Sequence, residues 1–417
     1  MYRVVGGDEE VSGTVARALP GIVTGVPDAE ATASGRWFDD IRLLEFGPSV
    51  FLFAQAAIPG LPISFPASYL AMAVLLVVAA LRHPRWPLRP VNGYIWAFVL
   101  LIGYYAAVSA SGVQSAGASD WVRRLFRMAI LLTFVGALAS GRLHFPSVIK
   151  GFATGLVINA VLFYAGVAPH PYQDYLTGFA GDKNTAGLVY AMGGLLLLVT
   201  LNSRRERIAA FLIFAVLIFL TGSRTTMAGT AAAVVWIFFA ARLSVVFRLG
   251  AGALLVWGLQ FAEERFARIG IFADRTGTDW FREQIAAGVS EKVAVTPPQG
   301  LGLGEAFVNI PQGRFYFHNS YDTLFVEGGY VALIVVLGIT VLAALRPLRS
   351  TSVSWSEGMV ESATVALLVC AWQLGEVFLT VSWGLLVAAG LQGTLRRRAD
   401  ARDGQPDAEE DRGAVVP

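Results

Sequence analysis

The chain has 417 residues, of which 55% are hydrophobic and 15% are charged, and its formal net charge at neutral pH is +2. Soluble domains carry about 25% charged residues, so this composition and a mean hydropathy of +0.59 exclude an ordinary soluble domain. The single cysteine, Cys370, excludes an intramolecular disulfide and a cysteine-based metal site.

The two ends of the chain differ in composition from the part between them. Residues 1–40 are rich in glycine, alanine and acidic residues, and they lack the basic and apolar regions of a signal peptide. Residues 396–417 are polar, charged and poor in apolar residues. Segments of this composition do not bury enough apolar surface to fold. We predict a disordered cytoplasmic tail at each end.

Apolar runs close to the length of about 20 residues needed to cross a membrane fill most of the chain between the tails. They predict an all-α integral membrane protein with about 12 transmembrane helices, the first nine within residues 41–261 and the last three within residues 321–395. The last two runs are short, so one hairpin in their place is an alternative. The runs lie at residues 42–58, 63–81, 93–111, 125–140, 146–168, 184–201, 207–222, 225–241, 245–261, 321–345, 358–377 and 380–395.

Positive charge alternates along the connections between these runs. Lysine and arginine are retained on the cytoplasmic side of a membrane, and with the N-terminus inside every inner connection is basic. Both termini are therefore predicted to be cytoplasmic, with residues 262–320 as one large loop on the opposite face. The inner connections carry Arg82, Arg85, Arg89, Arg142, Lys150, Arg204, Arg205, Arg207, Arg242, Arg248, Arg346 and Arg349.

The large loop at residues 262–320 is predicted to contain short helices. The segment "DWFREQIAAGVSEK" has helical spacing and an acidic start, whereas "PPQGLGLG" predicts a turn or loop. The glycines of "GLGLG" lack the strand-to-helix setting of a dinucleotide-binding motif. The aromatic residues of the loop offer faces for sugar rings, with anchoring to the membrane surface as the alternative.

Several cations lie on the predicted outer side, where positive charge is otherwise scarce. Arg224 is the most unusual, because "LTGSRTTMAG" is a very short connection and a guanidinium near the hydrocarbon boundary usually has a partner or a task. Arginine binds phosphate oxygens bidentately, and His318 has a pKa suited to taking a proton from a hydroxyl. These residues indicate a phosphate or pyrophosphate site. The other outer cations are Arg123, Arg124, Arg127, Lys183, Arg265, Arg268, Arg275, Arg282 and Arg314.

Each of these residues also has a purely structural interpretation. Arg224 could extend to the lipid headgroups from a helix end, and the loop arginines could be solvated charges. The segment from His318 to Ser320 could cap a helix, as could Asp182 or Asn184 in "GDKNTAG". No outer carboxylate cluster resembles a divalent-metal centre, so we expect transfer chemistry here to run without a metal or another cofactor.

At these positions the chain resembles the O-antigen ligase and polymerase superfamily, which includes exopolysaccharide polymerases. Four segments carry the resemblance in order: "GDKNTAG" at the start of a span, "LTGSRTT" at the outer end of another, "PPQGLGLGEAF" at the end of the long loop, and "HNSYDTLFVEGGYVALIVV" leading into a span. Together they cover about 160 residues, and the span number and topology agree across the rest.

The resemblance implies an enzyme of the bacterial inner membrane with its active site on the periplasmic side. The donor would be a glycan on undecaprenyl pyrophosphate, and the acceptor would be the lipid A core for a ligase or a second lipid-linked glycan for a polymerase. Transfer would invert the anomeric centre. Membrane lipid surrounds such a protein, and no nucleic-acid partner is expected.

The resemblance also implies roles for individual residues. Arg224 matches the arginine of the family's Ser-Arg motif, and His318 matches the histidine of its His-Asn motif; both are predicted to be catalytic. The predicted substrate-binding residues are Lys183, Asn184, Asn319, Glu327 and Arg275. Arg275 precedes Trp280 at a longer spacing than the family's second arginine has before its tryptophan, so its match is the loosest.

Two other protein classes fit parts of the pattern. A secondary transporter would also have about 12 spans, but such proteins have broken helices and ion sites near the midplane of the membrane. A non-catalytic component of a polysaccharide export system would need neither Arg224 nor His318. The sequence does not distinguish a ligase from a polymerase.

Overall fold

Helices make up most of the part of the chain that the structure describes. The structure is a computed structural model that describes residues 41–56, 65–112, 115, 120–172, 174–239, 245–246, 248, 250, 279–347 and 354–403. The tail predicted at residues 1–40, most of the span predicted at residues 245–261, and Arg275 lie outside this part.

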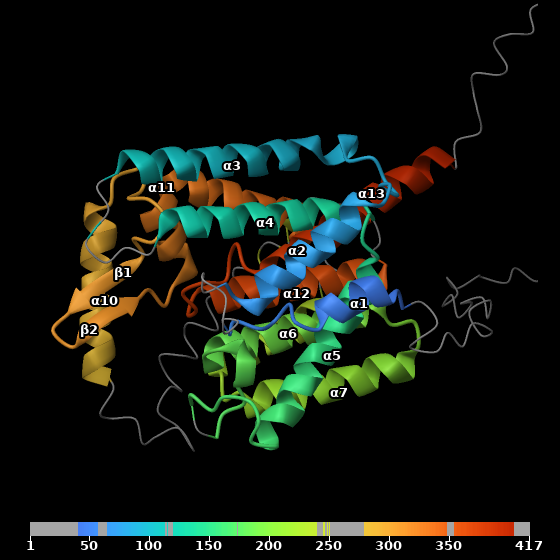
Figure 1. Cartoon of the computed structure of the whole chain (residues 1–417), viewed down its shortest axis with the longest axis horizontal. Helices are drawn as coiled ribbons and strands as arrows, with labels where there is room; N and C mark the ends of the chain where they lie inside the picture. Colours follow the sequence, from blue (N-terminus) through green and yellow to red (C-terminus); the bar gives the residue numbers. More distant parts are fainter. Residues whose placement is uncertain are drawn as a thin grey trace, which may run out of the picture. The chain divides into compact units, whose positions relative to one another are not determined.

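The helices follow the order of the predicted apolar runs (Figure 1). The π-helix Thr340–Leu345 continues α11, and short 3-10 helices lie at Arg89–Val91 and Gly178–Ala180. The α-helices are α1 (Leu43–Ser49), α2 (Ala67–Ala80), α3 (Asn92–Ser111), α4 (Trp121–Ala139), α5 (Phe145–Tyr164), α6 (Lys183–Thr200), α7 (Arg204–Leu220), α8 (Arg224–Phe239), α10 (Asp279–Val295), α11 (Ser320–Ile339), α12 (Trp355–Ala371) and α13 (Val381–Asp403).

Four helical stretches of the described chain are long and apolar enough to cross a membrane: Arg89–Ser111, Phe145–Tyr164, Lys183–Thr200 and Ser320–Leu345. Helix α2 is apolar but shorter, with 14 residues. The fold is thus α-helical and compatible with a membrane protein.

The structure differs from the prediction at both ends of the described chain. Helix α1 has only 7 residues and contains Pro48, so it is much shorter than the span predicted at residues 42–58. Helix α13 continues beyond Leu395 to Asp403, into the segment predicted to be disordered. Its basic turn is held in place, because Arg397 pairs with Glu357 and Arg398 donates to the Pro90 carbonyl over 3.0 Å. Helices α12 and α13 are separate helices that pack together.

The predicted inner connections contact one another, in a region that we call the basic end. Arg82 forms an ion pair with the buried Glu45, and Arg142 donates to the Arg82 carbonyl over 2.6 Å. Arg346 lies 3.0 Å from Glu357, which also pairs with the C-terminal basic turn. Connections far apart in sequence therefore share one end of the helices, as the alternation of charge predicts.

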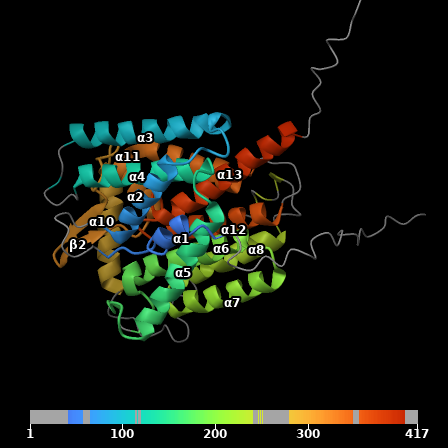
Figure 2. The same ribbon diagram turned by 45° about the vertical axis from the view of Figure 1, so that its right-hand side comes forward.

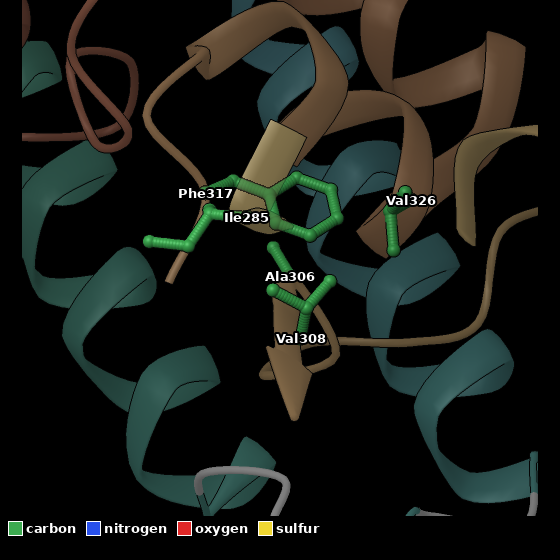
Figure 3. Close-up of a cluster of buried hydrophobic side chains, with 5 residues drawn as sticks. All are labelled: Ile285, Ala306, Val308, Phe317 and Val326. Carbon is green, nitrogen blue, oxygen red and sulfur yellow. The ribbon is translucent and has the colours of Figure 1, made fainter. Parts of the chain in front are cut away.

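Residues 279–320 form a small packed unit at the opposite end, which we call the site end. Helix α10 and the hairpin of β1 (Phe307–Ile310) and β2 (Gly313–Tyr316) lie beside the ends of α3 and α4 (Figure 1). Their shared apolar cluster joins α10, the hairpin and α11 (Figure 3), and consists of Ile285, Ala306, Val308, Phe317 and Val326. The loop contains the predicted helix, and the hairpin was not predicted.

Helix α11 is broken after its second turn. Gly328 and Gly329 have non-helical backbone angles, and Gly329 has a φ of 59°, which favours glycine. The loop "PPQGLGLG" enters the break: Leu301 N donates to Val326 O over 2.7 Å, and Tyr330 N donates to Pro298 O over 3.0 Å. A Cβ on Gly329 would overlap the Pro298 carbonyl oxygen. The glycine-rich segment thus supplies hydrogen bonds that the helix lacks at its break.

Candidate active site

The starts of α6 and α8 lie against each other at the site end. Asp182 caps α6, because its carboxylate accepts from the backbone N–H groups of Asn184 and Thr185. Ser223 Oγ, directly before Arg224, donates to Asn184 Oδ1 over 3.3 Å and lies 2.8 Å from Thr226 Oγ1. The capping role predicted for "GDKNTAG" is therefore confirmed for Asp182, and the side chain of Asn184 reaches the Ser-Arg motif.

Two cationic side chains accompany these helix starts. Arg224 is the first residue of α8 and is half-buried. Lys183 is the first residue of α6, and its ammonium lies 5.1 Å from the ring centroid of Tyr175. The positive ends of two helix dipoles and two cations thus share this region, an arrangement that favours an anion.

His318 lies in the connection between β2 and α11 and is exposed to solvent. Asn319 caps α11, because its side-chain oxygen accepts from the N–H groups of Tyr321 and Asp322 over 2.9 and 3.4 Å. The cap predicted for this segment is confirmed for Asn319, whose side-chain amide oxygen accepts hydrogen bonds from the first turn of the helix. His318 is positioned just ahead of that cap.

The last turn of α12 and the residues directly after it join the segment of His318 to the start of α8. Cys370 Sγ lies 3.9 Å from the carbonyl oxygen of Thr225, the residue after Arg224. About one turn later, the Leu374 carbonyl accepts from Ser320 Oγ, and Gly375 packs on the Phe317 carbonyl so closely that a Cβ would overlap it. The three segments that carry the predicted site thus meet through the end of α12 and the residues that follow it.

Glu327, predicted to bind substrate, is buried in an ion-pair cluster. Arg124 Nη2 lies 3.1 Å from Glu327 Oε1 and 3.1 Å from Glu376 Oε1, and Gly304 N donates to Glu327 Oε1 over 2.9 Å. The side chain of Glu327 is 5% exposed, whereas that of Glu376 is 62% exposed. The cluster connects α4, the glycine-rich loop, the break in α11 and the segment after α12 that contacts residues 317–320.

A second buried carboxylate fixes the start of the hairpin. Glu305 is 1% exposed and lies 3.3 Å from Lys292 of α10, and both of its oxygens accept from Ser115, each over 2.7 Å. Lys292 also donates to the Phe307 carbonyl over 3.1 Å. These contacts hold α10 and the hairpin together beside the site.

The loop arginines have different positions. Arg275 lies outside the described residues, as does the side chain of Arg282. Arg314 lies on β2, with its guanidinium 5.1 Å from the Phe307 ring centroid. Arg124 was noticed in the sequence only as an outer cation, and Glu376 was not predicted at all. A basic turn at the start of an apolar run is a weak signal for an ion-pair cluster, since the acidic partners are more than 200 residues away in the sequence.

We expect Arg124→Ala to destabilise the protein strongly, because it leaves the Glu327 carboxylate buried without its ion-pair partner. Removing one partner of such a pair costs roughly 3 kcal/mol or more. Arg123→Ala is the matched control: Arg123 pairs with Asp120 over 3.7 Å at an exposed position, where such pairs contribute about 0–1 kcal/mol. Thermal unfolding of both variants in detergent measures the difference. Equal unfolding temperatures would contradict a stabilising role for the cluster.

No protein-family model matches the chain, and the comparison with curated proteins finds no match.

Proposed function

We propose that this chain is a bacterial inner-membrane glycosyltransferase. It transfers a glycan from undecaprenyl pyrophosphate to an acceptor hydroxyl at the periplasmic face, with inversion and without a metal. The observation that carries the proposal is the meeting of three distant segments at the site end. Asn184 contacts Ser223 over 3.3 Å, Cys370 in the last turn of α12 contacts Thr225, and Leu374 just after α12 contacts Ser320.

The donor side of the proposed reaction is cationic. Arg224 binds the pyrophosphate and stabilises the charge that it gains on leaving, with Lys183 and the dipoles of α6 and α8 contributing to the same field. Arg275 is the proposed second arginine. Asn184, whose side chain contacts Ser223, helps to position the start of α8.

His318 acts on the acceptor side. The acceptor oxygen forms a bond to the anomeric carbon while the bond from that carbon to the phosphate oxygen breaks. His318 takes the proton of the attacking hydroxyl, and undecaprenyl pyrophosphate leaves with the bonding electrons. An exposed position before the cap of α11 allows the imidazole to reach a bound acceptor. Asn319 and Glu327 support the site through the helix cap and the ion-pair cluster.

The proposed topology places the basic end in the cytoplasm and the site end in the periplasm, because basic connections are retained inside. Besides the four long helices, the proposed set of about 12 spans includes the shorter apolar helix α2 and the 17-residue helix α12. Residues 262–320 then form the periplasmic loop.

We expect a cysteine placed at Gln312, in the exposed turn of the hairpin, to react with a membrane-impermeant maleimide added from the periplasmic side. A cysteine at the exposed Ala401 of α13 should react only after the inner membrane is opened. The native Cys370 is fully buried and gives a low background. The reverse pattern would contradict the orientation and the proposed side of the reaction.

The broken α11 is a feature that transporters share, so transport is the second candidate function. In this chain the break is filled by residues 298–302 of the same protein, which form backbone hydrogen bonds across it. A gap filled in this way does not leave an open substrate site in the helix.

Deletion of this protein from its host cell distinguishes a transferase from a transporter. Without the proposed transferase, the glycan should accumulate on undecaprenyl pyrophosphate in the periplasmic leaflet, where a lectin added to spheroplasts can bind it. Accumulation in the cytoplasmic leaflet alone would indicate a transporter. Restoration of the polysaccharide by a His318→Ala chain would indicate a non-catalytic component.

A further inference from the structure

A cavity lies away from the proposed active site, between α2, α3 and α4. Helices α2 and α3 each pack on α4 (Figures 1 and 2), and residues of all three helices line an apolar groove. The cavity has a volume of about 450 Å³ and is lined by residues such as Leu76, Phe98, Ile102, Leu132 and Gly136. Its size is in the range of small-molecule sites.

The groove is apolar along its length and basic at one end. Ser140 and Arg142 line the end at which α4 stops, and the other lining residues run toward the middle of α3. The cavity therefore extends from the basic end to about the middle of the helices, which is the depth of one leaflet. In a membrane, such an apolar groove is filled by a hydrocarbon chain.

The charged residues at the mouth of the groove indicate which headgroup such a hydrocarbon chain would carry. Arg142 Nη1 donates to the carbonyl oxygens of Ala79 and Arg82, and no carboxylate of the described chain forms an ion pair with it. Arg85 and Arg396 each lie 5.1 Å from the ring centroid of Trp86. The backbone of the 85–86 segment is fixed at the mouth, because both N–H groups donate to the Ser140 carbonyl. Arginines beside an interfacial tryptophan suit an anionic headgroup.

We infer that this groove binds an anionic phospholipid, with one acyl chain between α2, α3 and α4 and the phosphate at Arg142 and Arg85. The site is separate from the proposed glycan site, and the inference depends on the proposed orientation only for assigning the lipid to the cytoplasmic leaflet.

Two glycines provide a matched test of the acyl-chain site. Gly136 lines the groove, and a Cβ there would approach nothing closer than Ile95 Cδ1 at 4.0 Å, so the side chain of Gly136→Leu has room to start into the cavity. Gly103 of α3 is exposed, has nothing within 4 Å of such a Cβ and does not line the groove. Phosphatidylglycerol is titrated onto the delipidated full-length protein and bound lipid is counted by native mass spectrometry. We expect Gly136→Leu to weaken binding about tenfold or more and Gly103→Leu to leave it within about twofold.

The headgroup is tested separately with a neutral lipid. Wild-type protein should bind phosphatidylglycerol more tightly than phosphatidylcholine, and Arg142→Gln should remove most of this preference, whereas Arg205→Gln on the exposed start of α7 should keep it. If Gly136→Leu does not fold, Thr133→Leu fills the same groove from an exposed lining position. Equal phosphatidylglycerol binding by the filling and control variants would overturn the site. Equal affinity of the wild type for both lipids would overturn its preference for an anionic lipid.

Discussion

Arg224→Ala is expected to abolish glycan transfer while leaving expression and membrane insertion intact. Arg224 begins α8 beside the start of α6, so its guanidinium adds a charge to the positive ends of two helices. Loss of one group that stabilises developing charge costs about two to three orders of magnitude in rate. Arg224→Lys should restore part of the activity, because an ammonium keeps the charge but lacks the bidentate geometry.

The control for this experiment is Arg205→Ala, which removes an exposed arginine at the basic end of α7. Turnover of both variants is measured with the lipid-linked donor in proteoliposomes. Arg205→Ala should match the wild type. Full activity of Arg224→Ala would assign Arg224 to an interaction with lipid headgroups and remove it from the reaction.

His318→Ala is expected to lower transfer by roughly two orders of magnitude or more if His318 acts as a general base. Binding of the donor should survive, because Arg224 and Lys183 remain at the starts of α8 and α6. If the imidazole only orients the acceptor hydroxyl, His318→Gln should keep appreciable activity. Donor binding and turnover measured on the same preparations separate these roles.

His170 provides a matched control for this histidine. It lies in the connection after α5, where its ring stacks on Phe163 with centroids 4.1 Å apart. His170→Ala should retain transfer, since the proposed reaction does not use it. Equal loss of donor binding and turnover in His318→Ala would place His318 on the donor side or in the framework of the site.

The alternation of charge predicted that basic connections lie at one end of the helices. Arg82 and Arg142 lie 60 residues apart and interact directly, as expected for connections at the same end. This signal is strong because the basic residues of each connection lie close together in the sequence. The helix in "DWFREQIAAGVSEK" and the caps at Asp182 and Asn319 were predictable for the same reason, since a cap acts within its own first turn.

The features that the sequence did not predict depend on contacts between distant residues. Arg124 meets Glu327 and Glu376 only after α4, α11 and the end of α12 have packed together. The hairpin has strands of four residues, which are too short for a clear alternating pattern. Hydropathy alone did not reveal that α1 ends after 7 residues, because apolar residues continue beyond it.

The most direct test of the central proposal is a reaction with purified components. The full-length protein is reconstituted in liposomes with an undecaprenyl-pyrophosphate-linked glycan and an acceptor glycan, and the lipid products are separated and quantified. We predict that undecaprenyl pyrophosphate is released in step with formation of the joined glycan, and that Arg224→Ala and His318→Ala both stop the release. Movement of an intact donor across the bilayer, without any release of undecaprenyl pyrophosphate, would contradict the proposed function.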